Sequence, residues 1–120
     1  MIVLVCGGRD FTDDVLLEHV LDQLHEEHCF TKLIHGGAYG ADTLAGTWAH
    51  WRGVPKKVYR AQWEKHGKAA GPIRNQRMLD EGKPDLVVAF EGRVGTADMV
   101  SKAKKVGIAV ITVNKKGARP

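Results

Sequence analysis

The stretch LVVAFEGRVGTADM, residues 86–99, decides the fold of this chain. Its first five residues form an unbroken apolar run, and Gly92 and Gly95 then open a segment of helical periodicity that reaches about Val106. Such a strand-to-helix junction often holds an anion, because glycine lets the backbone approach a ligand and a helix start offers unpaired N–H groups. Glycine also serves merely to turn the chain. The arrangement gains weight because it recurs twice more in the sequence.

Short apolar runs alternate with helical segments along the chain. The runs cover residues 2–6, 32–35, 57–60, 86–90 and 108–113. This alternation predicts a single α/β domain over residues 1–120, a Rossmann-like three-layer sandwich of about five parallel strands with four helices. The first, fourth and fifth runs are continuous and β-branched, which predicts strands covered on both faces. The third run is short and polar, which predicts an edge strand.

The boundaries of the helices are marked by local signals. Thr12 is predicted to cap the first helix, and Pro72 to begin the third. The fourth helix is expected to start near Thr96, to pack its Val106 and to end at Gly107. About eleven polar residues, 61–71, precede the third helix, and a connection of that length is often a binding element or a lid.

Composition limits the class of protein. The chain has 120 residues, 43% hydrophobic and 27% charged, which is typical of a globular domain. It has no apolar run of membrane-spanning length and no basic leader, so we expect a cytoplasmic protein without a membrane partner. Cys6 and Cys29 are expected to be buried thiols rather than a disulfide. The net charge of +4 suits a phosphate-bearing ligand.

Several kinds of site are disfavoured. The spacing of His25, His28 and Cys29 permits metal ligation, but no fourth ligand is evident and we expect no metal. Nucleophile-elbow, P-loop, HExxH, CxxC and GxGxxG patterns are absent, and no cofactor is expected. Two basic clusters, one at Lys102, Lys104 and Lys105 and one at Lys115, Lys116 and Arg119, are interpreted as solvated surface.

The junctions should meet at one edge of the sheet, because in a parallel sheet the helix N-termini lie at the carboxyl ends of the strands. The residues predicted to line a shared ligand crevice are Gly7, Gly8, Arg9, Asp10, Gly36, Gly37, Ala38, Gly40, Asp42, Arg74, Asn75, Gly92, Gly95 and Thr96. The alternative is that these glycines only allow tight turns.

Individual side chains in these junctions have alternative roles. Arg9 and Asp10 form either a ligand clamp or a local ion pair. Asp42 either complements a helix dipole or accepts hydrogen bonds from a ribose. Trp63 either stacks on a base or anchors its own loop.

Four ordered motifs resemble the SLOG superfamily, and most closely its YpsA-related branch of bacteria and their phages. They are GGRDF at 7–11, IHGGAYGAD at 34–42, GKAAGPIRN at 67–75 and GTADM at 95–99. Together they span nearly the whole chain. The resemblance implies a Rossmann-like fold that binds a nucleotide or a nucleotide-derived ligand at the carboxyl edge.

The Lonely Guy (LOG) enzymes, relatives within this superfamily, cleave the N-glycosidic bond of nucleoside monophosphates. Arg74 matches their functional arginine, and Gly92, Gly95 and Thr96 match their phosphate loop. The chain departs from the LOG pattern at Asn75, Glu91, Arg93 and Met99. The last position holds the catalytic glutamate in LOG, and a methionine cannot do acid–base chemistry. The neighbouring Asp98 is either a re-aimed carboxylate or an acidic residue favoured by the helix start.

The leading hypothesis is therefore a nucleotide-binding module that acts as a sensor or sequesters its ligand. One alternative is a nucleotide N-glycosidase in which Arg74 and Asp98 are catalytic, or in which Asp10 or Asp42 replaces the glutamate. A second is a DNA-associated module like the related protein Smf, which the lack of an extended basic groove disfavours. Self-association into a homo-oligomer is expected, because Trp48, Trp51 and the stripe of the first helix offer much apolar surface.

Overall fold

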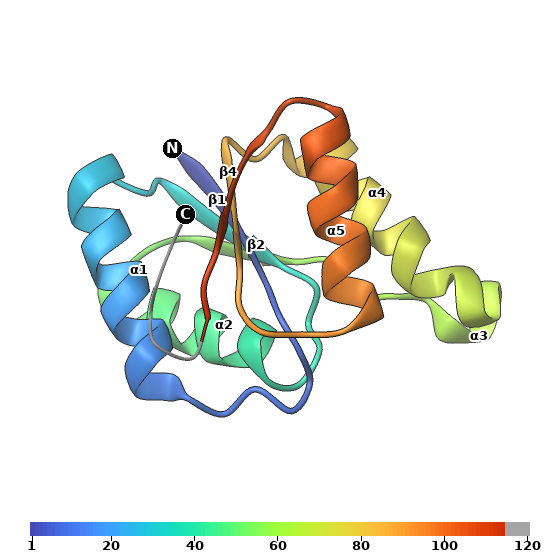
Figure 1. Cartoon of the computed structure of the whole chain (residues 1–120), viewed down its shortest axis with the longest axis horizontal. Coiled ribbons are helices and arrows are strands. Elements are labelled where there is room, and N and C mark those ends of the chain that lie inside the picture. The colour runs from blue at the N-terminus through green and yellow to red at the C-terminus, as the bar shows by residue number, and fades with distance from the viewer. Residues whose placement is uncertain (115–120) are drawn as a thin grey trace.

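The computed structural model describes residues 1–114 and contains one parallel sheet with helices on both faces (Figure 1). The elements are β1 (Ile2–Cys6), α1 (Asp14–His28), β2 (Lys32–His35), α2 (Ala41–Arg52), β3 (Lys56–Val58), α3 (Trp63–His66), a 3-10 turn (Gly67–Ala69), α4 (Ala70–Gly82), β4 (Leu86–Ala89), α5 (Val94–Lys105) and β5 (Ala109–Thr112). The basic cluster predicted at residues 115–119 lies outside the described residues.

The strands are ordered β3-β2-β1-β4-β5, and every neighbouring pair is parallel. This is the common doubly wound order, in which the chain runs outward from β1 to one edge and then returns to build the other. The predicted Rossmann-like α/β fold is confirmed, and β3 is an edge strand as expected. The strand order reverses between β1 and β4, so the junctions that follow these two strands lie side by side.

Two apolar cores cover the two faces of the sheet. Helices α1 and α2 pack on one face, around Leu21, Trp48 and Phe90. Helices α4 and α5 pack on the other, around Met78 and Met99. Strands β1 and β4 are covered on both sides, which explains why their sequences are apolar without alternation.

The opposite edge of the sheet differs from the prediction. Strand β5 was expected to be covered on both faces, but Ala109 and Thr112 are exposed because β5 is the outermost strand. Val106 is also exposed, at 60%, since α5 ends one residue earlier. Cys29 is exposed rather than buried, and neither it nor the buried Cys6 forms a disulfide.

The helix starts also shift by one or two residues. Asp13, not Thr12, caps α1, and its carboxylate accepts a hydrogen bond from the Leu16 amide at 3.0 Å. Helix α4 begins at Ala70, two residues before Pro72, and α5 begins at Val94 rather than near Thr96. The predicted polar loop before α4 is largely helical, because α3 and the 3-10 turn fill residues 63–69.

The apolar surface that was expected to drive self-association is mostly covered within one chain. Trp48 is 2% exposed, and it packs against His25 and Phe30 while its indole N–H donates to Asp22 at 2.8 Å. The stripe of α1 is equally buried. Trp51 alone keeps the predicted exposure, at 74%. Within residues 1–114, no helix combines the length and the apolar character needed to span a membrane.

Candidate functional site

The three glycine junctions contact one another at the carboxyl edge of the sheet. The Gly8 amide donates to the Glu91 carbonyl at 2.9 Å, and the Ala41 amide donates to the Gly8 carbonyl at 3.3 Å. Gly40 has a φ of +81°, and a Cβ there would collide with the Gly8 carbonyl oxygen. A Cβ on Gly92 would collide with the hydroxyl of Thr96. These glycines are therefore required for close backbone packing, and the same packing brings the junctions together as predicted.

Two helix N-termini at this edge have no side-chain cap. Helix α2 follows Gly40 and α5 follows Arg93, and neither residue caps its helix, whereas α1 is capped by Asp13. Because α5 begins at Val94, the amides of Gly95 and Thr96 belong to its first turn. First-turn amides have no partner within their helix and carry partial positive charge. This edge therefore offers hydrogen-bond donors to an anion.

Asp42 holds the loop between β2 and α2. It is 5% exposed, and its Oδ2 accepts hydrogen bonds from the amides of Gly36 at 3.1 Å and Ala38 at 3.2 Å. Burial raises the pKa of this carboxyl group to about 6, although these two bonds and Arg74 act in the opposite direction. The carboxylate thus has a structural task, and the predicted contact with a ribose stays a prediction.

His35 belongs to the same loop and was not singled out from the sequence as a site residue. Its Nδ1 accepts a hydrogen bond from the Gly37 amide at 3.0 Å, so this nitrogen carries no proton. Burial is the main reason that the pKa of His35 falls to about 4. The ring lies against Gly46, where a Cβ would approach Nε2 to 2.9 Å. A glycine in the middle of a helix, such as Gly46, is the sequence signal that a bulky side chain packs against that position of the helix.

Arg74 lies at the predicted crevice. Its Nη1 donates to the carbonyl oxygens of Gly36 at 2.7 Å and Tyr59 at 3.4 Å, and its Nε donates to Oδ1 of Asn75 at 3.1 Å. Burial lowers the pKa of the half-buried guanidinium, and the charge of Arg9 adds to that shift while Asp42 opposes it. The side chain is therefore fixed before any ligand arrives.

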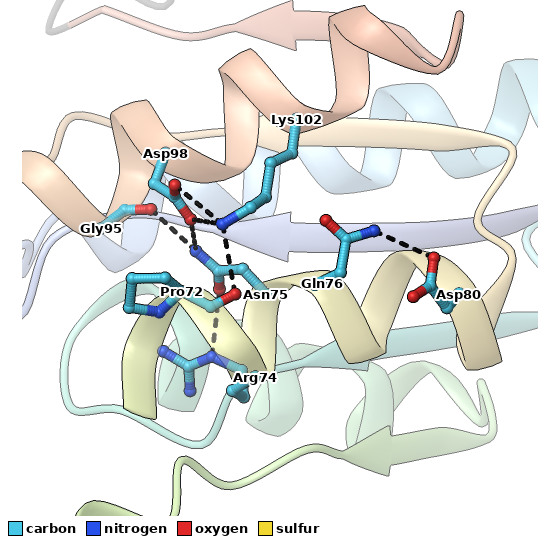
Figure 2. Close-up of polar contacts among 8 residues, drawn as sticks. All are labelled: Pro72, Arg74, Asn75, Gln76, Asp80, Gly95, Asp98 and Lys102. Carbon is cyan, nitrogen blue, oxygen red and sulfur yellow. Dashed lines mark hydrogen bonds and ion pairs between the residues drawn. The ribbon is translucent and has the colours of Figure 1, made fainter. Parts of the chain in front are cut away.

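Asn75 and Asp98 join α4 to α5 (Figure 2). The Asn75 amide nitrogen donates to the Gly95 carbonyl at 3.1 Å and to Oδ2 of Asp98 at 3.0 Å. Lys102 donates to the same carboxylate at 2.7 Å and to the Pro72 carbonyl at 3.2 Å. Burial by itself would raise the pKa of Asp98, but the hydrogen bonds from Lys102 and Asn75 lower it. Asn75, predicted to line the crevice, and Asp98, predicted as catalytic in the N-glycosidase alternative, are thus both engaged between helices.

Met99 is completely buried. It is 0% exposed in the core beneath α4 and α5, and so cannot contact a ligand at the edge of the sheet.

The first junction shows a different ion pair from the one considered. Asp10 pairs with Arg93 at 3.4 Å, and both side chains are more than 80% exposed. Arg9 instead lies over the ring of Trp63, with its guanidinium carbon 5.9 Å from the ring centroid. Trp63 is 50% exposed at the start of α3, so the predicted stacking on a base stays a prediction.

A cationic hollow lies between the end of β3 and helix α4. It is shallow and half open, and its space of about 210 Å³ includes open solvent; its lining consists of Arg60, Gln62, His66, Ala70, Ile73, Arg74 and Arg77. Only Arg74 was predicted from the sequence as a site residue. The others follow a short edge strand or lie on an exposed helix face, where arginines are common. Residues 1–114 contain no group of three or more His, Cys, Asp or Glu side chains suited to a metal ion.

Comparison with known proteins identifies the family. The family model described as "YspA, cpYpsA-related SLOG family" matches residues 1–66. The chain belongs to this SLOG family. Across the full domain, it is 40% identical over 123 residues to the Gene 61 protein of Mycobacterium phage D29, which covers 95% of this chain and 97% of that protein. The family predicted from the glycine motifs is thus confirmed.

A solved structure shares the fold of this SLOG domain. The crystal structure of Acinetobacter baumannii MurG aligns with a TM-score of 0.61 and 16% sequence identity, over 94% of this chain. The SLOG domain spans 34% of the MurG chain. At that identity the likeness concerns the fold alone.

Proposed function

We propose that this SLOG domain binds a nucleotide or a nucleotide-derived ligand at the carboxyl edge of its sheet, as a sensor or a sequestering module. The observation that carries the proposal is the position of Arg74. Its guanidinium is fixed on the Gly36 carbonyl at 2.7 Å, next to the loop that leads into the uncapped helix α2. A fixed guanidinium beside the first turn of a helix without a side-chain cap matches the oxygens and the charge of a phosphate.

In this proposal the phosphate lies against residues 92–96 and 36–40. Arg9 and Arg74 supply positive charge. Arg9 is exposed, and Trp63 beside it offers a half-exposed aromatic face to the base. Asp42, Asn75 and Asp98, whose polar atoms are already engaged, act by shaping this edge.

Binding is favoured over N-glycosidic cleavage because each of the three carboxylates considered for the reaction already contacts another group of the protein. Asp98 is paired with Lys102 at 2.7 Å, and Asp10 is paired with Arg93. Asp42 has a raised pKa but gives Oδ2 to two backbone amides. A general base or nucleophile must reach the substrate, and Asp42 and Asp98 are held by other protein groups.

Calorimetric titration with nucleoside mono- and diphosphates and with dinucleotides tests the proposal. We expect saturable binding to the wild-type domain, and a loss of about tenfold or more in affinity in Arg74→Gln, since charge-assisted bonds to phosphate are strong. Lys104→Gln, on an exposed turn of α5, removes the same charge and should bind normally. Absence of binding to all these ligands would sink the proposal, and release of free base from a monophosphate would show an enzyme instead.

We also propose that the domain self-associates. The specific support is Trp51, which is 74% exposed near the C-terminal end of α2. Sedimentation velocity should then show a species larger than a monomer that Trp51→Glu disperses. If the wild-type protein stayed monomeric at about 100 µM, self-association would be contradicted.

A further inference from the structure

Two arginines from different elements are held side by side on one loop. Nη1 of Arg74 donates to the Gly36 carbonyl at 2.7 Å, and Nη1 of Arg60 contacts the next carbonyl, that of Gly37, at 3.4 Å. The glycines make room for both. A Cβ on Gly36 would collide with Arg74, and one on Gly37 would lie 3.0 Å from Nη1 of Arg60. Both guanidinium groups therefore lie directly against this loop.

The positive charge of this pair is only partly compensated, because the nearby Asp42 opposes the lowering of the Arg74 pKa by burial without forming an ion pair with it. Among residues 1–114, neither Arg60 nor Arg74 forms an ion pair. The hollow that they line contains no carboxylate, and its rim adds His66 and Arg77. Of these, Arg77 alone has an acidic partner, Glu81, at 2.9 Å.

Arg74 is half-buried and Arg60 is exposed, and an anion that binds between them is attracted by both charges. Nε and Nη1 of Arg74 are engaged with protein groups, so its Nη2 and the guanidinium of Arg60 are the donors that face the oxygens of a phosphate. The hollow is open and shallow, which suits one phosphate group on a larger ligand rather than a buried molecule.

We propose that the hollow at Arg60, His66, Arg74 and Arg77 is a second anion subsite, and that the ligand is a nucleotide with more than one phosphate group. This inference rests on the proposed function, in which the first phosphate lies at the glycine junctions. Arg74 borders both positions, so the two phosphates lie next to each other in the bound ligand. The domain then selects nucleoside diphosphates or dinucleotides over monophosphates.

The affinity ratio between diphosphates and monophosphates tests the subsite. With AMP, ADP, GMP and GDP as probes, we expect the wild-type domain to bind the preferred diphosphate about tenfold more tightly than its monophosphate, since one additional charge-assisted contact is of that order. Arg60→Gln should bring the ratio close to one while leaving monophosphate affinity nearly unchanged. Lys57→Gln, a nearby exposed cation outside the lining of the hollow, should keep the ratio. An unchanged ratio in Arg60→Gln, or equal losses for both ligands, would overturn the subsite.

A second measurement separates this inference from the proposed function. Arginine Nε–Hε resonances are followed by NMR while inorganic phosphate is added to millimolar concentration. In the wild-type domain, saturable shifts of the Arg60 and Arg74 resonances support the subsite even if no nucleotide binds. In Arg60→Gln, the Arg74 resonance should no longer shift when phosphate is added. If nucleotides bind but phosphate moves neither resonance, the subsite fails and the proposed function stands.

Discussion

At the scale of single residues, two buried side chains next to one loop have opposite pKa shifts. The pKa of Asp42 is raised to about 6, and that of His35 is lowered to about 4, in both cases mainly by burial. The folded protein holds the Asp42 proton that the unfolded chain releases, so this group loses stabilising effect as the pH rises from about 4 to 6. Folded His35 excludes a proton that the unfolded chain binds, so its contribution to stability increases as the pH rises. The two contributions oppose each other over this window.

Asp42→Asn should therefore expose the contribution of His35. An amide oxygen can accept the same two hydrogen bonds from Gly36 and Ala38, so the loop should persist. We expect the free energy of unfolding of the variant to fall by about 3 kcal/mol as the pH is lowered from 6.5 to 4, since one proton is worth about 1.4 kcal/mol per pH unit. The wild type should change less. Urea titrations at a series of pH values measure this, and parallel curves for the two proteins would contradict it.

Gly40 offers a second prediction at this scale. Its φ of +81° and ψ of −129° suit glycine almost alone, and a Cβ would collide with the Gly8 carbonyl. Gly40→Ala should lower the free energy of unfolding by about 3 kcal/mol or more. Gly53→Ala is the matched control, because Gly53 has a φ of +70° but nothing within 4 Å. It should cost about 1 kcal/mol, the backbone strain alone. Equal losses in denaturant titrations would show that the packing of the junctions does not matter.

At the scale of elements, one buried amide forms hydrogen bonds between α4 and α5. Asn75 is 4% exposed and links Arg74 on its own helix to Gly95 and Asp98 on the other. Asn75→Ala should cost about 2–3 kcal/mol, because it leaves buried polar groups without partners. Gln76→Ala, whose amide binds only Asp80 on the same exposed face, should cost less than about 0.5 kcal/mol (Figure 2). Similar costs in urea denaturation would contradict the bridging role.

Element types were predictable where the sequence has strong periodicity, and the contacts between elements were not. The run before Glu91 and the stripe of α1 each gave the correct element. The helical turn at Trp63 was read as loop, because four residues are too few to show a period. Asp98 contacts Lys102, four residues later on the same helix, and Asn75 on α4. The contact with Asn75 could not be predicted from the sequence, because it forms only when α4 and α5 pack together.

At the scale of the whole molecule, the fold class followed from the alternation of strands and helices, but the exposure of each strand did not. Strands β4 and β5 are both apolar in sequence, yet β4 is central and β5 lies at the edge. Strand order depends on which face each crossover helix covers, and residue types do not report that directly. The meeting of the glycine junctions at the carboxyl edge was predictable for the same reason as the fold, while the proximity of Arg60 to Arg74 required the two chain segments to be placed in space.

The distribution of charge over the molecule argues against binding of long nucleic acids. Arg9, Arg60 and Arg74 lie at the carboxyl edge, whereas Lys104 and Lys105 lie at the opposite end of α5, and Lys102 is engaged by Asp98. These cations, all within residues 1–114, are separated in a way that suits a compact anion better than a continuous phosphate backbone. A single-stranded 20-nucleotide DNA should thus bind with a Kd weaker than about 100 µM at 150 mM NaCl, as for weak non-specific binding. Fluorescence anisotropy measures this. A nucleic-acid partner would be identified instead if the DNA bound more tightly and the logarithm of its association constant fell by about three or more for each tenfold rise in salt concentration.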